Sequence, residues 1–476
     1  MLLTCGALLV HGYHPGADDA EIYIPGIKKL LNPSLYPFGD EFFQSHARMT
    51  VFPHLVAWSV RLTHLPFDVV IFLWHVACLF LFLLACWRLS RLCFEDPRAR
   101  WGGVVLVAAL LTLPVSGTAL NIMDPYFTAR SISAFGVVFP IADVLEKKYV
   151  RACFWIVLTA AVHPLMAVFG FSFLVLLVGM RKFAPVGAPA ALLLPFGLTL
   201  KRPSDAYLEA VQTRSYFFLL HWPWYAWVGI LAPLVLFWWF GRMARRNRLA
   251  TLELLSRTLI VFGGIYFVAG LVLTVPERFV GLTFLQPMRS LMIEYVLLFL
   301  FIGGFLGQWV LKNRIWLWMV IFAPLCAGMW YAQRADFPAD RHVEWPGVAT
   351  KNRWVEAFLW IRQNTPQDAI FALDPKHMEI PDEGLQGFRA IAERSMLADA
   401  WKDAGACTMF PQSPMAEHWR EQVNATRGWS GFTVEDLRRL KQSFGVSWVV
   451  LERSGISDLT CPYQNDRVMV CRVNEQ

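Results

Sequence analysis

The residues best suited to chemistry lie in one polar stretch, residues 13–48, between a short apolar start and a long series of apolar segments. The ionisable side chains that we select in it are Asp18, Asp19, Glu21, His46 and Arg48, of which we predict that His46 and Arg48 contact the substrate. Carboxylates at the rim of a membrane-spanning segment usually mark a functional site. A carboxylate in such a partly dry place can act as a general base, because burial raises its pKa toward neutrality.

The first acidic cluster also has structural interpretations. Asp18 or Asp19 could cap a helix that begins near Ala20. Glu21 follows Asp18 at the spacing of a capping box. Two adjacent carboxylates could also share a divalent cation with a third ligand. We predict a catalytic role for at least one of the two aspartates, and either a substrate contact or a capping role for Glu21.

Four further polar residues lie beside apolar segments, namely Asp124, Arg130, His163 and Arg289. Asp124 precedes a proline, so it either starts a turn or contacts a metal or substrate. Arg130 either pairs with Asp124 or meets a phosphate. His163 lies at a helix break and is either hydrogen-bonded structure or a ligand. Arg289 opens an apolar segment, where it either anchors the interface or binds a phosphate through two parallel hydrogen bonds.

The composition places these residues in a membrane protein. The chain has 476 residues, of which 56% are hydrophobic and 17% charged, whereas soluble domains carry about 25% charged residues. The class is therefore a polytopic α-helical membrane protein. The net charge of +7 predicts no nucleic-acid partner, because most of the excess Lys and Arg lies in short loops between apolar segments. Glycine-rich phosphate-binding loops are absent from the sequence, which argues against ATP-driven transport.

Hydropathy predicts about 11 membrane segments, one of which is the short Met1–Val10. The others are 67–87, 101–120, 131–145, a 152–180 stretch broken at His163-Pro164, 183–200, 222–240, 259–275, 288–311 and 315–331. A proline disfavours helix at the residue before it, hence the break. Because Met1–Val10 is too short to span a bilayer, we expect the natural start to lie upstream.

The basic loops between these segments predict the orientation. The loops 88–100, 146–151, 181–182, 241–257 and 312–314 contain most of the Arg and Lys, which places them in the cytoplasm. The opposite, external face then carries the loops 13–66, 121–130, 201–221 and 276–287, together with the C-terminus. All the candidate carboxylates therefore share one face, where we expect Asp18, Asp19 and Asp124 to converge in one pocket.

Beyond about Arg334 the composition becomes that of a soluble domain. Periodicity predicts helices over 352–364 and 435–444 and strands over 368–373, 446–451 and 467–473. We therefore expect a transmembrane domain over 1–332, with a first external loop at 13–66, and an external α/β domain over 333–476. In that compartment a disulfide could join Cys461 to Cys471, or Cys407 to one of them.

The layout resembles the GT-C superfamily of membrane glycosyltransferases, which use sugars linked to polyprenyl phosphate. The resemblance rests on a long first external loop with Asp18 and Asp19, an acidic second external loop with Asp124, and an external C-terminal domain. The segments FLWIRQNTPQDAIFALDP and FRAIAERS also resemble bacterial membrane proteins of this general type. No WWDYG-like signature is present, which disfavours an oligosaccharyltransferase acting on Asn.

The resemblance implies an inverting sugar transfer at the external face of a bacterial inner membrane, with the C-terminal domain in the periplasm. Asp18 or Asp19 would deprotonate or orient the acceptor, which would be a glycan, a lipid or a protein. Arg289, Arg130 and Arg48 would hold the donor phosphate among membrane lipids. Asp19 and Asp124 would be the ligands if the enzyme needs Mg²⁺ or Mn²⁺.

Two other classes remain open at this point. A transporter or flippase of lipid-linked glycans also uses acidic residues and helix breaks, but transporters place charges near the bilayer midplane, whereas these carboxylates crowd one rim. A non-catalytic membrane scaffold would display the C-terminal domain without needing so large and polar a first loop.

Overall fold

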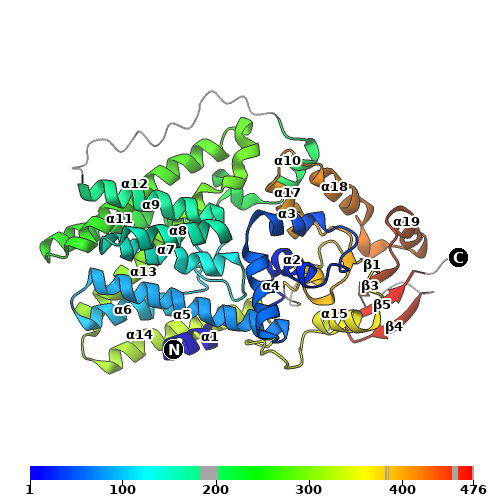
Figure 1. The fold of residues 1–476 in the computed structure, drawn as a ribbon, viewed down its shortest axis with the longest axis horizontal. Helices are drawn as coiled ribbons and strands as arrows, with labels where there is room; N and C mark the ends of the chain where they lie inside the picture. Colours follow the sequence, from blue (N-terminus) through cyan, green and yellow to red (C-terminus); the bar gives the residue numbers. More distant parts are fainter. Residues whose placement is uncertain (183–201, 381–382, 384, 453–458, 474–476) are drawn as a thin grey trace. The chain divides into compact units, whose positions relative to one another are not determined.

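The computed structural model describes residues 1–182, 202–380, 383, 385–452 and 459–473. The protein is mostly helical and contains one five-stranded sheet near the C-terminus (Figure 1). The chain divides into two compact units. Unit 1 comprises Met1–His11, Leu73–Arg202 and Ser215–Ala332, and unit 2 comprises Gly12–Phe72, Pro203–Arg214 and Gln333–Gln476.

Unit 1 is a bundle of helices. Its α-helices are α1 (Leu2–His11), α6 (Pro97–Ala109), α7 (Ala129–Leu145), α8 (Tyr149–Val162), α9 (Pro164–Lys182), α11 (Trp224–Arg246), α12 (Ala250–Thr274), α13 (Leu291–Phe305) and most of α5 (Phe67–Cys93) and α14 (Ile315–Asp336). Short helical turns are η2 (Ser215–Phe217), η3 (Leu219–His221), η4 (Glu277–Leu285), η5 (Pro287–Ser290) and η6 (Leu306–Leu311).

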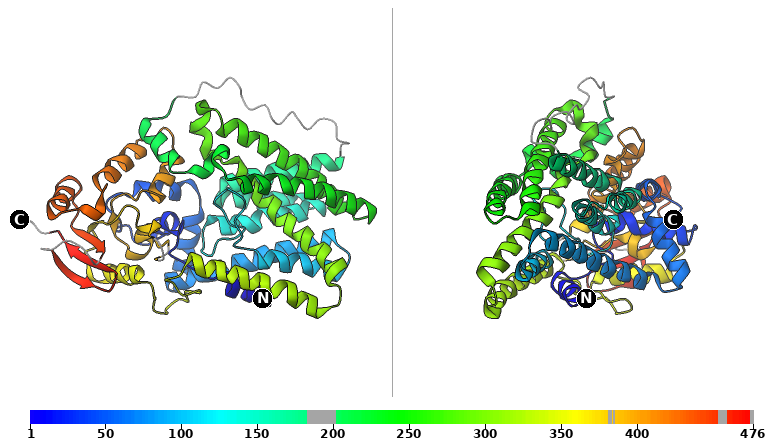
Figure 2. Two further views of the ribbon diagram at one scale, coloured as in Figure 1. Left: turned by 180° about the vertical axis from the view of Figure 1, so that it is seen from behind. Right: turned by 60° about the vertical axis from the view of Figure 1, so that its left-hand side comes forward.

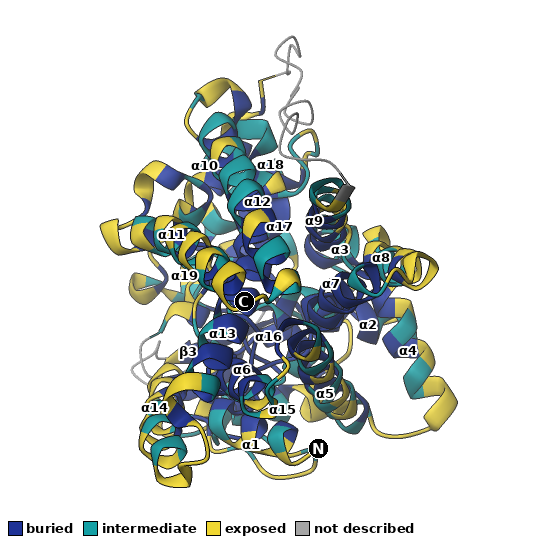
Figure 3. Cartoon of the chain, turned by 90° about the vertical axis from the view of Figure 1, so that its left-hand side faces the viewer, coloured by how far each residue is buried: buried dark blue, intermediate teal, exposed yellow. Residues whose placement is uncertain are grey.

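Close backbone contact joins α6 to α13 at the centre of unit 1. A Cβ on Gly102 would lie 2.2 Å from the carbonyl oxygen of Gly303, so both positions need glycine. Small residues allow this approach between membrane helices. Figure 3 shows α13 almost wholly buried, whereas α14 exposes apolar side chains such as Trp316, Met319 and Tyr331. In a bilayer such exposed apolar surface faces lipid.

Six helical segments among the described residues are long and apolar enough to cross a membrane. They are Phe67–Cys93, Pro164–Arg181, Trp224–Arg246, Ala250–Thr274, Glu277–Leu311 and Ile315–Asp336, and Leu2–His11 and Tyr149–Val162 are shorter apolar helices. The fold is therefore that of a helical membrane protein. The total of about eleven stays a prediction, because the segment 183–200 lies outside the described residues.

One predicted span is shorter than expected. Hydropathy predicted a helix over 101–120, but α6 ends at Ala109. A turn follows, in which Pro114 and Asn121 form an isolated bridge and Ser116 and Ala119 have positive φ. Proline lacks the N–H that would continue the helix, so the apolar residues after Ala109 fold as a loop. The break at His163-Pro164 is confirmed, because α8 ends at Val162 and α9 begins at Pro164.

Unit 2 combines helices of the first loop with the C-terminal sheet. Its helices are α2 (Ala20–Leu31), α3 (Glu41–Met49), α4 (Phe52–Thr63), α10 (Asp205–Gln212), α15 (Arg353–Asn364), α16 (Phe388–Ala392), α17 (Lys402–Thr408), α18 (Met415–Ala425) and α19 (Val434–Phe444), with the turns η7 (His377–Glu379) and η8 (Trp429–Gly431). The domain limits at 332 and 333 stay a prediction, but residues 12–72 belong to the same compact unit as the C-terminal residues.

The sheet has the strand order β2-β1-β3-β5-β4. Its strands are β1 (Ile370–Ala372), β2 (Ser395–Met396), β3 (Trp448–Glu452), β4 (Thr460–Gln464) and β5 (Val468–Arg472). Strand β1 is parallel to β2 and β3, and β5 is antiparallel to β3 and β4. The three predicted strands and both predicted helices of this region are confirmed. A disulfide joins Cys461 to Cys471 across β4 and β5, whereas Cys407 is a buried free thiol.

Helices cover both faces of the sheet. On one face Phe358 of α15 and Phe388 of α16 pack against Phe371 and Trp448, and Figure 2 shows α15 (yellow) beside the outer strands (red). On the other face α19 buries Leu437. Local signals define these helices, because the Asn352 side chain accepts hydrogen bonds at the start of α15, and Thr433 with Asp436 forms a capping box before α19.

His377 gives unit 2 a predicted sensitivity to acid. Its buried ring lies near Trp354 and Phe358, and burial lowers its pKa from 6.5 to about 4, against weaker opposing effects of Asp374 and Asp403. Below pH 6.5 the unfolded chain therefore binds a proton that the folded chain does not, and stability falls as pH falls toward 4.

The loss in the free energy of unfolding is expected to be roughly 2 kcal/mol at pH 5 and absent at pH 7.5. His377→Phe keeps an aromatic ring, so its thermal unfolding, followed by tryptophan fluorescence, should change less between the two pH values than that of the wild type. The exposed His418 supplies the control His418→Gln, which should behave as the wild type. Equal pH dependence of the wild type and His377→Phe would show that His377 does not titrate this way.

Candidate functional site

The segment that carries the acidic cluster is fixed by backbone hydrogen bonds within unit 2. The N–H of Tyr13 donates to the carbonyl of His342, and the N–H of Gly387 donates to the carbonyl of Gly16. The N–H of Asp18 donates to the carbonyl of Leu385 at 2.7 Å. Asp18 has a φ of 54°, a left-handed conformation that aspartate tolerates better than most residues. The chain then turns into α2 at Ala20, as predicted.

Asp18 and Asp19 both bind the side chain of Lys402. The ammonium lies 2.8 Å from Oδ1 of Asp19 and also forms an ion pair with Asp18. The two aspartate side chains are 25% and 22% exposed, whereas that of Lys402 is only 4% exposed. Asp19 occupies the N-cap position of α2 without a side-chain capping hydrogen bond. The pair therefore lies at the surface of unit 2, held on a buried cation.

Burial gives Lys402 an unusual acidity. Its ammonium packs 4.0 Å from the centre of the Trp401 ring, and burial lowers its pKa to about 7. The two adjacent carboxylates favour the charged form of the lysine. Lys402 can therefore stabilise an ionised carboxylate beside it and can also exchange a proton near neutral pH.

Glu21 is buried and belongs to a separate charged network with Arg389. Its carboxylate accepts hydrogen bonds from the backbone N–H groups of Arg389 and Ala390 at 3.0 and 2.9 Å. The guanidinium of Arg389 lies 3.3 Å from Glu21 and 2.8 Å from Asp403. Burial raises the pKa of Glu21 to about 8, against the opposing effects of Arg389 and the backbone donors.

The same network fixes α17. Burial raises the pKa of Asp403 to about 6, whereas Arg389 opposes this shift. Asp399 accepts hydrogen bonds from the N–H groups of Trp401 and Lys402. This arrangement holds α17, and thus Lys402, against the start of α2. The sequence analysis missed Lys402 and Arg389, although charges inside the small and apolar runs FRAIA and LADAWKDAGA were a signal for them.

The remaining first-loop residues lie on α3. The rings of His46 and Tyr23 make a T-shaped contact with the centroids 5.9 Å apart. Arg48 is exposed near the end of the helix. Their predicted roles in substrate binding stay predictions.

The other predicted residues lie in unit 1. Arg130 and Asp124 are both buried, and the guanidinium lies 2.7 Å from Oδ2 of the carboxylate. His163 caps the end of α8, where its Nδ1 accepts a hydrogen bond of 3.4 Å from the N–H of Met166. Arg289, in η5, lines a small pocket with Gln286 and aromatic residues of the 216–222 loop. Asp124 and Asp19 belong to different units. The prediction that they share a metal therefore stays a prediction, as does the convergence of the acidic loops in one pocket.

A pocket of about 170 Å³ lies within unit 2. Its lining includes Tyr13, Lys28, Asp68, Arg341, Glu344 and Trp345. Asp18 and Asp19 are not among the lining residues, whereas Gly16 is. The pocket thus combines cationic, acidic and aromatic groups beside the segment that leads to the aspartate pair. Such a mixture suits a polar ligand with an apolar face, as a sugar ring has.

A known family model matches part of unit 2. The model described as "Domain of unknown function (DUF6798)" matches residues 352–426, from the start of α15 to the end of α18. No curated protein matches the chain. The matched segment includes Arg389 and Lys402, which bind the acidic cluster of the first loop, and Asp403, which pairs with Arg389.

Proposed function

We propose that this protein is a membrane glycosyltransferase that moves a sugar from a polyprenyl-phosphate donor to a hydroxyl of an external acceptor. The observation that carries the proposal is the aspartate pair at the start of α2. Asp18 and Asp19 are partly exposed and fixed by the buried Lys402, so they combine access to an acceptor with a held geometry. Fixed position is a large part of what an enzyme supplies to a two-substrate reaction.

The proposed transfer is a direct displacement at the sugar. The acceptor hydroxyl attacks the anomeric carbon, the bond from that carbon to the phosphate oxygen breaks, and the hydroxyl proton passes to an aspartate. Attack from the side opposite the leaving phosphate inverts the anomeric centre, and the lipid keeps its phosphate. The Lys402 ammonium supports an ionised aspartate, which is the form that accepts a proton.

The disulfide of unit 2 supports an external position for this chemistry. Cys461 and Cys471 are bonded to one another, and disulfides persist in oxidising compartments such as the bacterial periplasm. Together with the basic loops that the sequence assigns to the cytoplasm, this favours a bacterial inner-membrane protein with unit 2 in the periplasm.

Transfer is tested with the purified full-length protein in lipid nanodiscs. The donors are undecaprenyl phosphates carrying radiolabelled glucose, galactose or mannose, and the acceptors are glycan, lipid and protein fractions of a bacterial envelope. We expect label to pass from at least one donor to an acceptor, with release of undecaprenyl phosphate. In proteoliposomes, movement of the intact donor across the bilayer without release of the phosphate would identify a transporter instead and overturn the proposal.

Arg289 is proposed to bind the donor phosphate. Its replacement by alanine is expected to weaken binding of undecaprenyl phosphate roughly 10- to 100-fold, because hydrogen bonds to charged groups contribute about 1.5–3 kcal/mol. Binding to the nanodisc-embedded protein is measured by fluorescence anisotropy of a labelled lipid. The exposed Arg278 in the same loop supplies the control Arg278→Ala, which should keep the wild-type affinity. Equal affinity of Arg289→Ala and the control would remove Arg289 from the donor site.

A further inference from the structure

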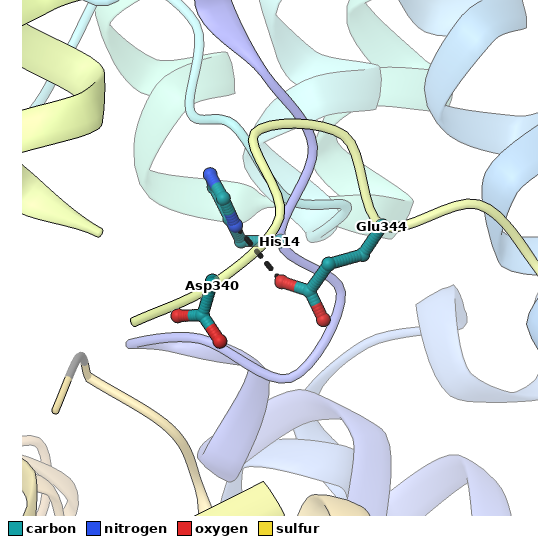
Figure 4. A group of neighbouring side chains, drawn as sticks. All are labelled: His14, Asp340 and Glu344. Atoms are coloured by element: carbon teal, nitrogen blue, oxygen red, sulfur yellow. Dashed lines mark hydrogen bonds and ion pairs between the residues drawn. The ribbon is translucent and has the colours of Figure 1, made fainter. Parts of the chain in front are cut away.

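Three potential metal ligands lie together in unit 2, away from the aspartate pair. His14 follows α1, and Asp340 and Glu344 lie in the connection after α14. One ligand atom of each residue lies within 4.8 Å of those of the other two, and Nδ1 of His14 is 2.8 Å from Oε1 of Glu344. Figure 4 shows the Glu344 carboxylate turned toward the imidazole of His14, with Asp340 beside them.

The backbone fixes these side chains from both segments. The N–H of Tyr13 donates to the carbonyl of His342, and the N–H of Glu344 donates to the carbonyl of Tyr13. The ring of His14 stacks on Phe337 with the centroids 3.9 Å apart. The backbone of both segments and the ring of His14 are therefore held in place. Such preorganisation is typical of a site that binds a metal.

The cluster is buried, and no lysine or arginine among the described residues pairs with its carboxylates. The His14 side chain is fully buried, Asp340 is 2% exposed, and the Glu344 side chain is 18% exposed. The guanidinium of Arg334 donates instead to the backbone carbonyls of Phe337, Pro338 and Asp340. Buried carboxylates of this kind are normally paired or coordinate a metal.

Two polar atoms of the cluster also lack hydrogen-bond partners among the described residues. They are Nε2 of His14 and Oδ1 of Asp340. The other oxygen of Asp340 accepts a hydrogen bond of 2.9 Å from Nε2 of Gln386. A hydrogen bond of this kind, from a neighbouring side chain to a metal-binding carboxylate, usually orients the carboxylate. Oδ1 of Asp340 stays available for a cation.

We infer that His14, Asp340 and Glu344 form a binding site for a divalent transition metal, with Zn²⁺ or Mn²⁺ as the fitting ions. One imidazole nitrogen and two carboxylates suit these ions, whereas Mg²⁺ prefers oxygen ligands alone. Small side-chain rotations would bring each ligand atom to about 2.0–2.2 Å from Zn²⁺. Glu344 also lines the pocket of unit 2, so a metal ion held by these residues would lie next to the pocket.

This inference does not depend on sugar transfer, and its first test uses the wild-type protein alone. The full-length protein in detergent is stripped with EDTA, dialysed, and then given Zn²⁺ or Mn²⁺. We expect about one tightly bound ion per chain by mass spectrometry of the metal, and a higher melting temperature with the ion than without it. No retained ion and an unchanged melting temperature with both metals would overturn the site, whatever the outcome of the transfer assay.

Variants then assign the ligands. His14→Gln, Asp340→Asn and Glu344→Gln should each weaken metal binding by roughly tenfold or more, since even outer contacts of metal ligands are worth 10- to 100-fold. The matched control is the more exposed pair of Glu41 and His418, 3.6 Å apart in the same unit. Glu41→Gln and His418→Gln should keep the wild-type affinity. Undiminished metal binding in all three ligand variants would refute the assignment, and the stripped wild type shows independently whether an ion binds.

Discussion

Replacing Asp18 and Asp19 together with asparagine is expected to lower the rate of sugar transfer about 10²- to 10⁴-fold, the usual contribution of a general base. Asparagine has nearly the same shape and can still accept a hydrogen bond from Lys402, but it cannot take up the acceptor proton. The proposed base is thus removed while the local packing is kept. The measurement is the initial rate of label transfer by the full-length variant in nanodiscs.

A control separates chemistry from folding in this experiment. Asp205 is an exposed aspartate in the first turn of α10, in the same unit, and Asp205→Asn should transfer at the wild-type rate. The double variant should melt within a few degrees of the wild type, because its aspartates are partly exposed. Undiminished transfer by the double variant would exclude both residues as the base. The single variants then show which aspartate carries the effect.

The C-terminal α/β fold was predictable because its signals are local. Apolar runs in 446–451 and alternation in 467–473 match β3 and β5, and a capping residue marks the start of α15. The unpredicted strands are β2, which has only two residues, and β4, whose residues are mostly exposed. Strand β2 is too short, and β4 lacks the apolar pattern, by which a strand is recognised in a sequence.

The charged network could not be predicted from the sequence, because its partners are far apart in the chain. Asp18, Asp19 and Glu21 are neighbours in sequence and looked alike, yet the first two bind Lys402 at the surface and the third binds Arg389 in the interior. Only tertiary structure separates these roles. The three metal-ligand candidates were missed for the same reason, since His14 and Glu344 are 330 residues apart in the sequence.

The membrane helices show where composition predicts well and where it does not. Long apolar runs such as Phe67–Cys93 and Ala250–Thr274 are helices. The run after Ala109 is equally apolar, but Pro114 and the residues with positive φ around it form a loop. Hydropathy reports burial in an apolar environment, whereas backbone hydrogen bonding decides whether the buried segment is a helix.

Arg389→Met is expected to lower the free energy of unfolding of the full-length protein by about 3–5 kcal/mol, the usual effect of breaking a buried ion pair on one side. Arg389 is 1% exposed and lies between Glu21 and Asp403. Burial would lower its pKa, but these carboxylates raise it further than burial lowers it. Removing the cation leaves two buried carboxylates without compensation. Urea unfolding followed by tryptophan fluorescence measures the loss.

The two carboxylates left without a cation allow a second test of the network. If stranded charges produce the loss, then Glu21→Gln and Asp403→Asn added to Arg389→Met should restore part of the stability, because neutral amides are less costly to bury than carboxylates. The control is Arg353→Met, which removes an arginine from an exposed pair with Glu356 and Asp466 and should have little effect. Equal losses in Arg389→Met and Arg353→Met would show that the network does not hold α17 and Lys402 against α2, and the geometry proposed for the aspartate pair would lose its support.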